Sequence, residues 1–185
     1  LEKENIDKCS MIGHSMGGYI TLAFAEKHPE MLDSFGLFHS SAYPDDEEKK
    51  ATRRKGIEFI RQHGSAKFLA QLIPGLFSDD FKKENPEVVK EIIDRYANFK
   101  PEALVQYYEA MMKRPDTTEV LKSAKVPVLF ILGELDTVVP VEKGLELSHL
   151  PEFSYIHLCK QSGHMGMLEE TESCNRALDD FLQNV

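Results

Sequence analysis

The sequence predicts an α/β fold built on a parallel sheet, with an all-helical insertion. Short apolar segments alternate with segments of helical periodicity, which is the pattern of strands joined by crossover helices. The strongest strand candidate, residues 126–132, is apolar without alternation, as expected for a strand buried on both faces of a parallel sheet. Between residues 44 and 122 no strand is evident. We therefore expect core segments at 1–43 and 123–185, with the insertion at 44–122 between them.

The first core segment begins with a strand that runs into a glycine turn and a helix. Proline at position 29 ends this helix, because the residue before a proline leaves the α region. The insertion opens with a densely charged helix from about residue 45, and Pro86 suits the first turn of a later one. In the second core segment, Pro127 is tolerated near the start of its strand. The expected strands are 8–13, 34–38, 126–132 and 153–158, and the further expected helices are 16–27, 86–98, 101–113, 141–148 and 171–182.

Composition and charge exclude several classes of protein. The 185 residues are 42% hydrophobic, which supports a packed core rather than disorder. Lys and Arg number 22 against 31 Asp and Glu, so the net charge of −9 disfavours binding to nucleic acid or to an anionic membrane. Three cysteines without a C-x-x-C motif suggest neither a disulfide scaffold nor a zinc ribbon. So few cysteines fit a reducing compartment, and no apolar run approaches the ~20 residues of a membrane span, so we expect a cytoplasmic protein.

The most informative motif is G-H-S-M-G-G at Gly13–Gly18, a G-x-S-x-G pattern placed between a strand and a helix. That context is the setting of a nucleophile elbow, in which a tight turn holds the serine in a strained backbone conformation. Ser15 is the candidate nucleophile. The backbone N–H of Met16, at the helix start, is the candidate donor to an oxyanion.

A serine nucleophile needs a base, and the base needs a carboxylate to orient it. Asp136 follows the buried strand and His164 follows the last strand, so both lie where parallel strands end. Two alternatives stay open. Glu134 is close enough to Asp136 in sequence to be the acid, and His39, at another strand end, competes with His164 as the base or lines the pocket. No histidine pair has the spacing of metal ligands, so we expect no metal site. A serine that forms an acyl-enzyme needs no cofactor, so we expect none.

Together these motifs resemble the α/β-hydrolase fold superfamily over nearly the whole chain. The resemblance rests on G-H-S-M-G-G, on G-E-L-D-T-V-V-P at Gly133–Pro140 and on S-G-H at Ser162–His164. It implies that Ser15 is the nucleophile, His164 the general base and then acid, and Asp136 its orienting carboxylate. It also implies that the insertion is a cap domain over the cleft. A helical stripe in that insertion fits ordinary packing better than contact with substrate: Tyr107, Tyr108, Met111 and Met112.

The chain also departs from that family. Only fourteen residues precede Ser15, and they hold no His-Gly loop for a second oxyanion donor. The sheet should therefore contain only the family's carboxy-terminal strands, and the strand before Ser15 should expose an edge that invites pairing. We expect part of a complete hydrolase, with a missing amino-terminal segment or a second copy of the chain at that edge.

The resulting functional prediction is a carboxylesterase-like serine hydrolase that cleaves a small ester or related acyl compound through an acyl-enzyme on Ser15. The only expected ligand is a small-molecule substrate. Cleavage of carbon–carbon bonds or thioesters by the same triad stays open, because the fold does not separate these reactions. A catalytically inactive binding module is the alternative from a different class.

Overall fold

The computed structural model describes residues 1–185, apart from the side chain of Glu2. The chain forms two compact units: unit 1 comprises Leu1–Tyr43 and Asp116–Val185, and unit 2 comprises Pro44–Pro115. The expected insertion reached residue 122, whereas unit 2 ends at Pro115. The reason lies in the short helix α6 (Thr118–Ser123), whose Leu121 is fully buried in the core of unit 1.

Unit 1 is built on a four-stranded parallel sheet with the strand order β1-β2-β3-β4. The strands are β1 (Cys9–His14), β2 (Leu32–Phe38), β3 (Val128–Gly133) and β4 (Ser154–Cys159). Strands β1 and β4 form the two edges of this sheet. The predicted parallel α/β architecture is confirmed, and the four expected strands are present with ends shifted by one or two residues.

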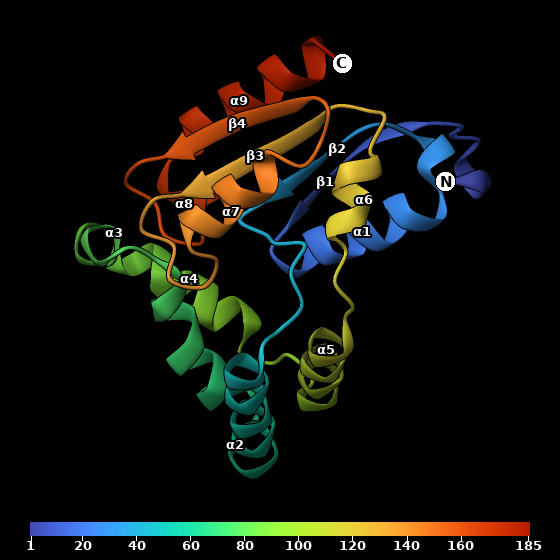
Figure 1. Ribbon diagram of the computed structural model, residues 1–185. Coiled ribbons are helices and arrows are strands. Elements are labelled where there is room, and N and C mark those ends of the chain that lie inside the picture. Colours follow the sequence, from blue (N-terminus) through green and yellow to red (C-terminus); the bar gives the residue numbers. More distant parts are fainter. The chain divides into compact units, whose positions relative to one another are not determined.

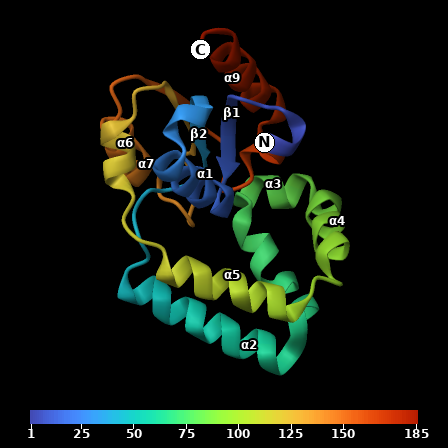
Figure 2. The ribbon, with the colours of Figure 1, turned by 90° about the vertical axis from the view of Figure 1, so that its right-hand side faces the viewer.

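Helices cover both faces of the sheet in unit 1 (Figures 1 and 2). Leu22, Leu121 and Leu147, from three helices, pack on one face, whereas Cys174 and Phe181 pack on the other. This arrangement explains the unbroken apolar run of β3, since all six of its residues are buried. The helical elements are α1 (Met16–Lys27), α6, α7 (Val141–Ser148), α8 (Gly166–Glu169) and α9 (Thr171–Gln183), with 3₁₀ turns at Glu2–Glu4 and Pro29–Met31.

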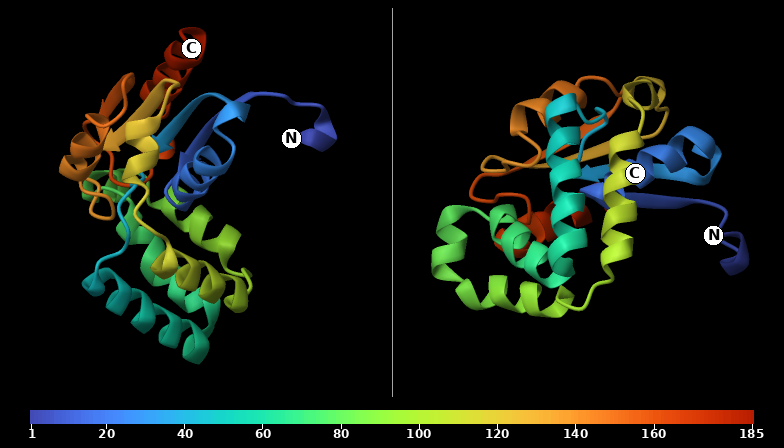
Figure 3. Two further views of the ribbon diagram at one scale, coloured as in Figure 1. Left: turned by 45° about the vertical axis from the view of Figure 1, so that its right-hand side comes forward. Right: turned by 90° about the horizontal axis from the view of Figure 1, so that it is seen from below.

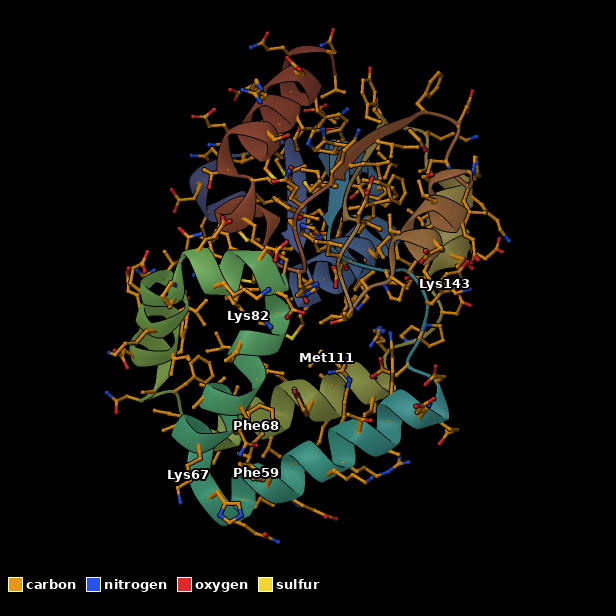
Figure 4. The ribbon with its side chains drawn as sticks, turned by 90° about the vertical axis from the view of Figure 1, so that its left-hand side faces the viewer. Phe59, Lys67, Phe68, Lys82, Met111 and Lys143 are labelled. Carbon is orange, nitrogen blue, oxygen red and sulfur yellow. The ribbon has the colours of Figure 1, made fainter. Side chains whose placement is uncertain are left out.

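Unit 2 consists of helices, and two of them, α2 and α5, run side by side (Figure 3). Its elements are α2 (Glu47–Leu72), a 3₁₀ turn (Ile73–Leu76), α3 (Asp79–Glu84), α4 (Pro86–Tyr96) and α5 (Pro101–Lys113). The sequence indicated only the charged start of α2. This helix bends at Gly64, which has the left-handed φ of 81°. Phe59 and Phe68 lie on either side of the bend with their rings 6.5 Å apart (Figure 4).

One buried carboxylate anchors the start of unit 2. The Asp45 side chain is fully buried, and its oxygens lie 2.5 Å from Arg53 Nε and 2.9 Å from Arg114 Nη1; we call these three residues the Asp45 cluster. Burial opposes ionisation, but both guanidinium groups hold the pKa of the Asp45 carboxyl below its usual value. Tyr108 packs within the same unit, with its ring 5.5 Å from Phe68 and 5.2 Å from the Arg53 guanidinium.

The carboxyl ends of the four strands of unit 1 all lie at the same end of the sheet (Figure 1). The loops at these carboxyl ends carry Ser15 after β1, His39 after β2, Asp136 after β3 and His164 after β4. Residues distant in sequence are thus brought to one place by the parallel topology. Among the described helices, none has the length and apolar character needed to cross a membrane.

Candidate active site

Ser15 occupies the turn between β1 and α1 in a strained backbone conformation. Its φ of 51° and ψ of −116° are rare for a residue other than glycine. The Ser15 N–H donates to the carbonyl of Phe38 at 2.9 Å, which ties the turn to the neighbouring strand β2. The Ser40 hydroxyl donates to the Ser15 carbonyl at 2.7 Å. Because both backbone groups of Ser15 are fixed by β2 and the loop after it, the strained turn is held in place.

The glycines around Ser15 have different roles. A Cβ on Gly13 would lie 2.3 Å from the backbone of Gly17, and one on Gly18 would lie 2.2 Å from Ser40 Oγ. A Cβ on Gly17 would meet nothing within 4 Å. Close packing of the turn therefore requires glycine at positions 13 and 18. At position 17, the second glycine of the G-x-S-x-G pattern, the structure leaves room for a side chain.

The structure brings the three predicted side chains together in one hydrogen-bonded chain. His164 Nε2 lies 2.8 Å from Ser15 Oγ, and His164 Nδ1 lies 2.8 Å from Asp136 Oδ2. Asp136 and His164 are buried, whereas Ser15 is partly exposed. A carboxylate only accepts hydrogen bonds, so Nδ1 carries a proton and Nε2 presents its lone pair to the serine hydroxyl. This is the tautomer in which a histidine can accept the proton of a serine.

The Asp136 carboxylate is held by donors on both of its oxygens. Oδ1 accepts the backbone N–H groups of Val138 and Val139 at 2.8 and 2.9 Å, and Oδ2 accepts from His164. Burial opposes ionisation, but these donors, together with the nearby His39, hold the pKa of the Asp136 carboxyl well below its usual range. Asp136 is therefore ionised at neutral pH and fixed in orientation.

His14, inside the G-H-S-M-G-G motif, contacts the loop that carries His164. Its Nε2–H donates to the His164 carbonyl at 2.8 Å, and the two rings lie 5.1 Å apart. Burial lowers the pKa of His14 to about 4, so the ring is neutral at pH 7. Sequence reasoning assigned no role to His14 or to Ser40. Both act through contacts between residues far apart along the chain, which the motif alone does not display.

The sequence left Glu134 open as the acid and His39 open as the base, and the structure gives each a position different from that of Asp136 or His164. Glu134 is exposed, while the Asp136 side chain is fully buried and contacts His164. His39 is buried rather than open to solvent, with Nδ1 3.3 Å from Asp136 Oδ2. Among the described histidines, it is His164 whose ring nitrogen reaches Ser15 Oγ.

Met16 begins helix α1 directly after Ser15. The first N–H groups of a helix have no acceptor within that helix, and the helix dipole favours negative charge beside them. The Met16 N–H is therefore among the helix-start groups that stay free of an acceptor within α1, and it remains the candidate oxyanion donor.

One group of side chains has the composition of a metal site. Ligand atoms of His39, Asp136 and His164 all lie within 4.8 Å of one another. However, Gly166 N–H donates to His39 Nε2 at 3.2 Å, so His39 Nδ1 bears the proton and has no lone pair for a metal. His164 Nδ1 likewise donates to Asp136. The group is thus arranged for hydrogen bonding to the carboxylate.

Comparison with known proteins agrees with the fold. The family model described as serine aminopeptidase, S33, matches residues 1–171. The chain is 28% identical to a thermophilic esterase from Thermogutta terrifontis whose structure superposes with a TM-score of 0.92, covering 99% of this chain and 67% of that one.

The names of two curated relatives state an enzymatic activity. A 2-hydroxy-6-oxo-6-(2'-aminophenyl)hexa-2,4-dienoic acid hydrolase from Metapseudomonas resinovorans is 27% identical over 95% of this chain and 60% of its own length. A 3-oxoadipate enol-lactonase from Acinetobacter baylyi is 25% identical over 100% of this chain and 68% of its own. The chain thus spans about two thirds or less of the length of these relatives. By its matched model, its fold and its neighbours, the chain belongs to the serine aminopeptidase S33 family within the α/β-hydrolase superfamily.

Proposed function

We propose that the chain contains the catalytic centre of a serine hydrolase that cleaves a small ester or related acyl compound. The observation that carries this proposal is the continuous chain of 2.8 Å contacts from Ser15 through His164 to Asp136, next to the start of a helix. The strained turn presents Oγ to this base. A serine in hydrogen-bond contact with an oriented histidine is an activated nucleophile.

The proposed reaction uses these side chains in sequence. Ser15 Oγ attacks the substrate carbonyl carbon while His164 Nε2 takes the hydroxyl proton. The Met16 N–H stabilises the resulting oxyanion. His164 then gives the proton to the departing alcohol, and an acyl-enzyme remains on Ser15. His164 then deprotonates a water that attacks the acyl carbonyl, and as the acyl–oxygen bond breaks His164 returns this proton to Ser15 Oγ, which releases the acid and restores Ser15.

The immediate neighbours of Ser15 favour chemistry on a neutral acyl group. His14 is uncharged at neutral pH, and the ionised Asp136 carboxylate is held by its N–H donors and contacts His164 rather than Ser15. The esterase from Thermogutta terrifontis, at 28% identity, supports an ester as substrate. We further propose that unit 2 is the family's cap and that it selects the substrate.

A second candidate is hydrolysis of a carbon–carbon bond beside a carbonyl group. It is favoured by the similarity to the dienoic acid hydrolase from Metapseudomonas resinovorans at 27% identity. The same serine and histidine would serve, because that reaction also releases an acyl fragment after attack on a carbonyl.

Hydrolysis of a panel of p-nitrophenyl esters with acyl chains of two to about ten carbons tests the proposed function. A Ser15→Ala variant serves as the control, and a vinylogous 1,5-diketone acid tests the second candidate. We expect ester turnover that falls by about 10³-fold or more in Ser15→Ala. Turnover of the diketone alone would favour the second candidate. Equal rates for the wild type and the Ser15→Ala variant on every substrate would refute both candidate functions.

A further inference from the structure

His39 is a buried histidine that the proposed reaction does not use. It follows β2, with 1% of its surface exposed, and its φ of 47° lies in the left-handed region. This backbone conformation is uncommon for residues other than glycine, although histidine adopts it more readily than most. The His39 N–H donates to the Ile131 carbonyl at 2.8 Å, which fixes the residue beside β3.

Two glycines leave the space that the His39 ring fills. A Cβ on Gly133 would lie 2.9 Å from His39 Cε1, and a Cβ on Gly166 would lie 2.4 Å from His39 Nε2. Both distances are too short for real atoms. The ring is therefore enclosed between the end of β3 and the start of α8. Both segments adjoin loops that carry the candidate catalytic side chains, Asp136 and His164.

The proton on the His39 ring has a defined position. Gly166 N–H donates to Nε2 at 3.2 Å, so Nε2 presents its lone pair and Nδ1 carries the hydrogen. That Nδ1 is buried and has no hydrogen bond of full geometry among the described residues. Its nearest acceptor is Asp136 Oδ2 at 3.3 Å, the oxygen that also accepts from His164. Hydrogen bonds in such sites are often long before substrate binds.

We propose that His39 is a positioning residue that directs its Nδ1–H to Oδ2 of Asp136. This contact weakens the stabilisation of protonated His164 by the Asp136 carboxylate. The proposal rests on the proposed function. His39 links the carboxylate to Gly166, two residues beyond His164, so one ring holds both the acid and the segment that bears the base. The other titratable groups beside it are His14, at a ring distance of 6.1 Å, and the Cys174 thiol near Gly166.

The direction of the effect follows from the charge on Asp136. A donor on Oδ2 draws part of the carboxylate's charge to itself, so removal of that donor leaves more of the charge facing His164. The protonated form of His164 then becomes more favourable, and that form does not accept the Ser15 proton. Activity should therefore be lost at a higher pH as the solution is acidified.

Two substitutions separate the two hydrogen bonds of His39. In His39→Asn the side-chain amide nitrogen takes the place of Nδ1, which keeps the donor to Asp136 and loses the acceptor for Gly166. Asparagine also tolerates a left-handed backbone. In His39→Gln the longer side chain places its oxygen where Nε2 was, which keeps the Gly166 contact and loses the donor. The proposal requires these two variants to differ.

The first readout is the pH dependence of kcat/KM for the best ester. We expect the midpoint of the acid limb to rise by about 0.5–1 pH unit in His39→Gln, the size expected when one hydrogen bond to a charged group is lost. In His39→Asn the midpoint should stay within about 0.2 unit, although kcat falls severalfold because the Gly166 contact is lost. Thermal unfolding and labelling by a fluorophosphonate at pH 9 verify that each variant is folded.

The second readout needs no turnover. In chains labelled with ¹⁵N-histidine, NMR should show His39 with its proton on Nδ1, and the His164 Nδ1–H resonance should move in His39→Gln but not in His39→Asn. The role of His39 would be overturned if the wild type and both variants had the same His164 Nδ1–H resonance and the same pH profile. An equal change in both variants would also overturn it. An inactive wild type with the expected NMR differences would refute the proposed function while leaving the positioning role supported.

Discussion

Substitution of Asp136 by asparagine tests how the tautomer of His164 is set. The Asp136 Oδ1 atom accepts two backbone N–H groups, from Val138 at 2.8 Å and Val139 at 2.9 Å. In Asp136→Asn the amide oxygen should keep this place, because the flipped amide would leave two donors facing its NH₂ group at about 1–3 kcal/mol each. The amide nitrogen must then occupy the Oδ2 position, 2.8 Å from His164 Nδ1.

That orientation reverses the hydrogen bond to the base. The amide nitrogen donates to His164 Nδ1, so the imidazole proton moves to Nε2 and the base no longer accepts the Ser15 proton. A flip penalty of at least about 2 kcal/mol leaves no more than about one chain in 30 in the productive orientation. The same change in a serine protease triad lowers kcat by about 10⁴. We therefore expect kcat to fall by about 10³–10⁴.

The assay is steady-state ester hydrolysis together with the rate of labelling by a fluorophosphonate. Glu134→Gln is the matched control, because Glu134 is two residues away and exposed, and its rate should stay within about twofold. Thermal unfolding verifies that both variants are folded. Retention of activity within tenfold in Asp136→Asn, or an equal loss in Glu134→Gln, would show that the hydrogen-bonded chain does not set the tautomer.

Three further predictions concern stability. Gly18→Ala should lower the unfolding temperature by several degrees, because the new Cβ lies 2.2 Å from Ser40 Oγ, whereas Gly17→Ala has open space; a similar loss in both contradicts this. The pKa of His14 is about 4, below the 6.5 of an unfolded chain, so the unfolded state binds the extra proton and stability is lost as pH falls from 6.5 toward 4. Urea unfolding should show that the free energy of unfolding decreases by about 2 kcal/mol from pH 7 to pH 5, and His14→Gln should remove this decrease. The same decrease in the variant would refute His14 as its cause. Asp45→Ala removes the carboxylate that pairs with the two partly buried guanidinium groups of the Asp45 cluster and should cost about 3–5 kcal/mol by chemical denaturation, with a loss below 1 kcal/mol as the contrary result.

The sequence predicted those parts of the fold that local pattern determines. Helices α1, α5 and α7 begin and end at the residues expected, since proline, turn residues and apolar spacing mark their ends. Helix α2 was underestimated. Its glycine at position 64 and its many charges weaken the periodic pattern, while packing against α5 supports its full length.

The candidate site was predictable for a topological reason. In a parallel sheet, the carboxyl ends of all strands lie together, so three motifs that follow these ends meet there whatever their separation in sequence. The roles of His14 and Ser40, and the burial of His39, depend on side chains from other strands and loops. For instance, the Gly166 N–H that fixes the His39 tautomer is 127 residues away along the chain. No local pattern reports such a contact.

The most direct test of the central claim is intact-mass analysis of the 185-residue chain after exposure to a fluorophosphonate, beside the Ser15→Ala variant. The claim is that Ser15, His164 and Asp136 form an assembled nucleophilic centre. The account predicts one phosphonyl adduct per wild-type chain, located at Ser15 by peptide mapping, and none on Ser15→Ala. An unmodified wild-type chain, or an adduct that persists in Ser15→Ala, would contradict it.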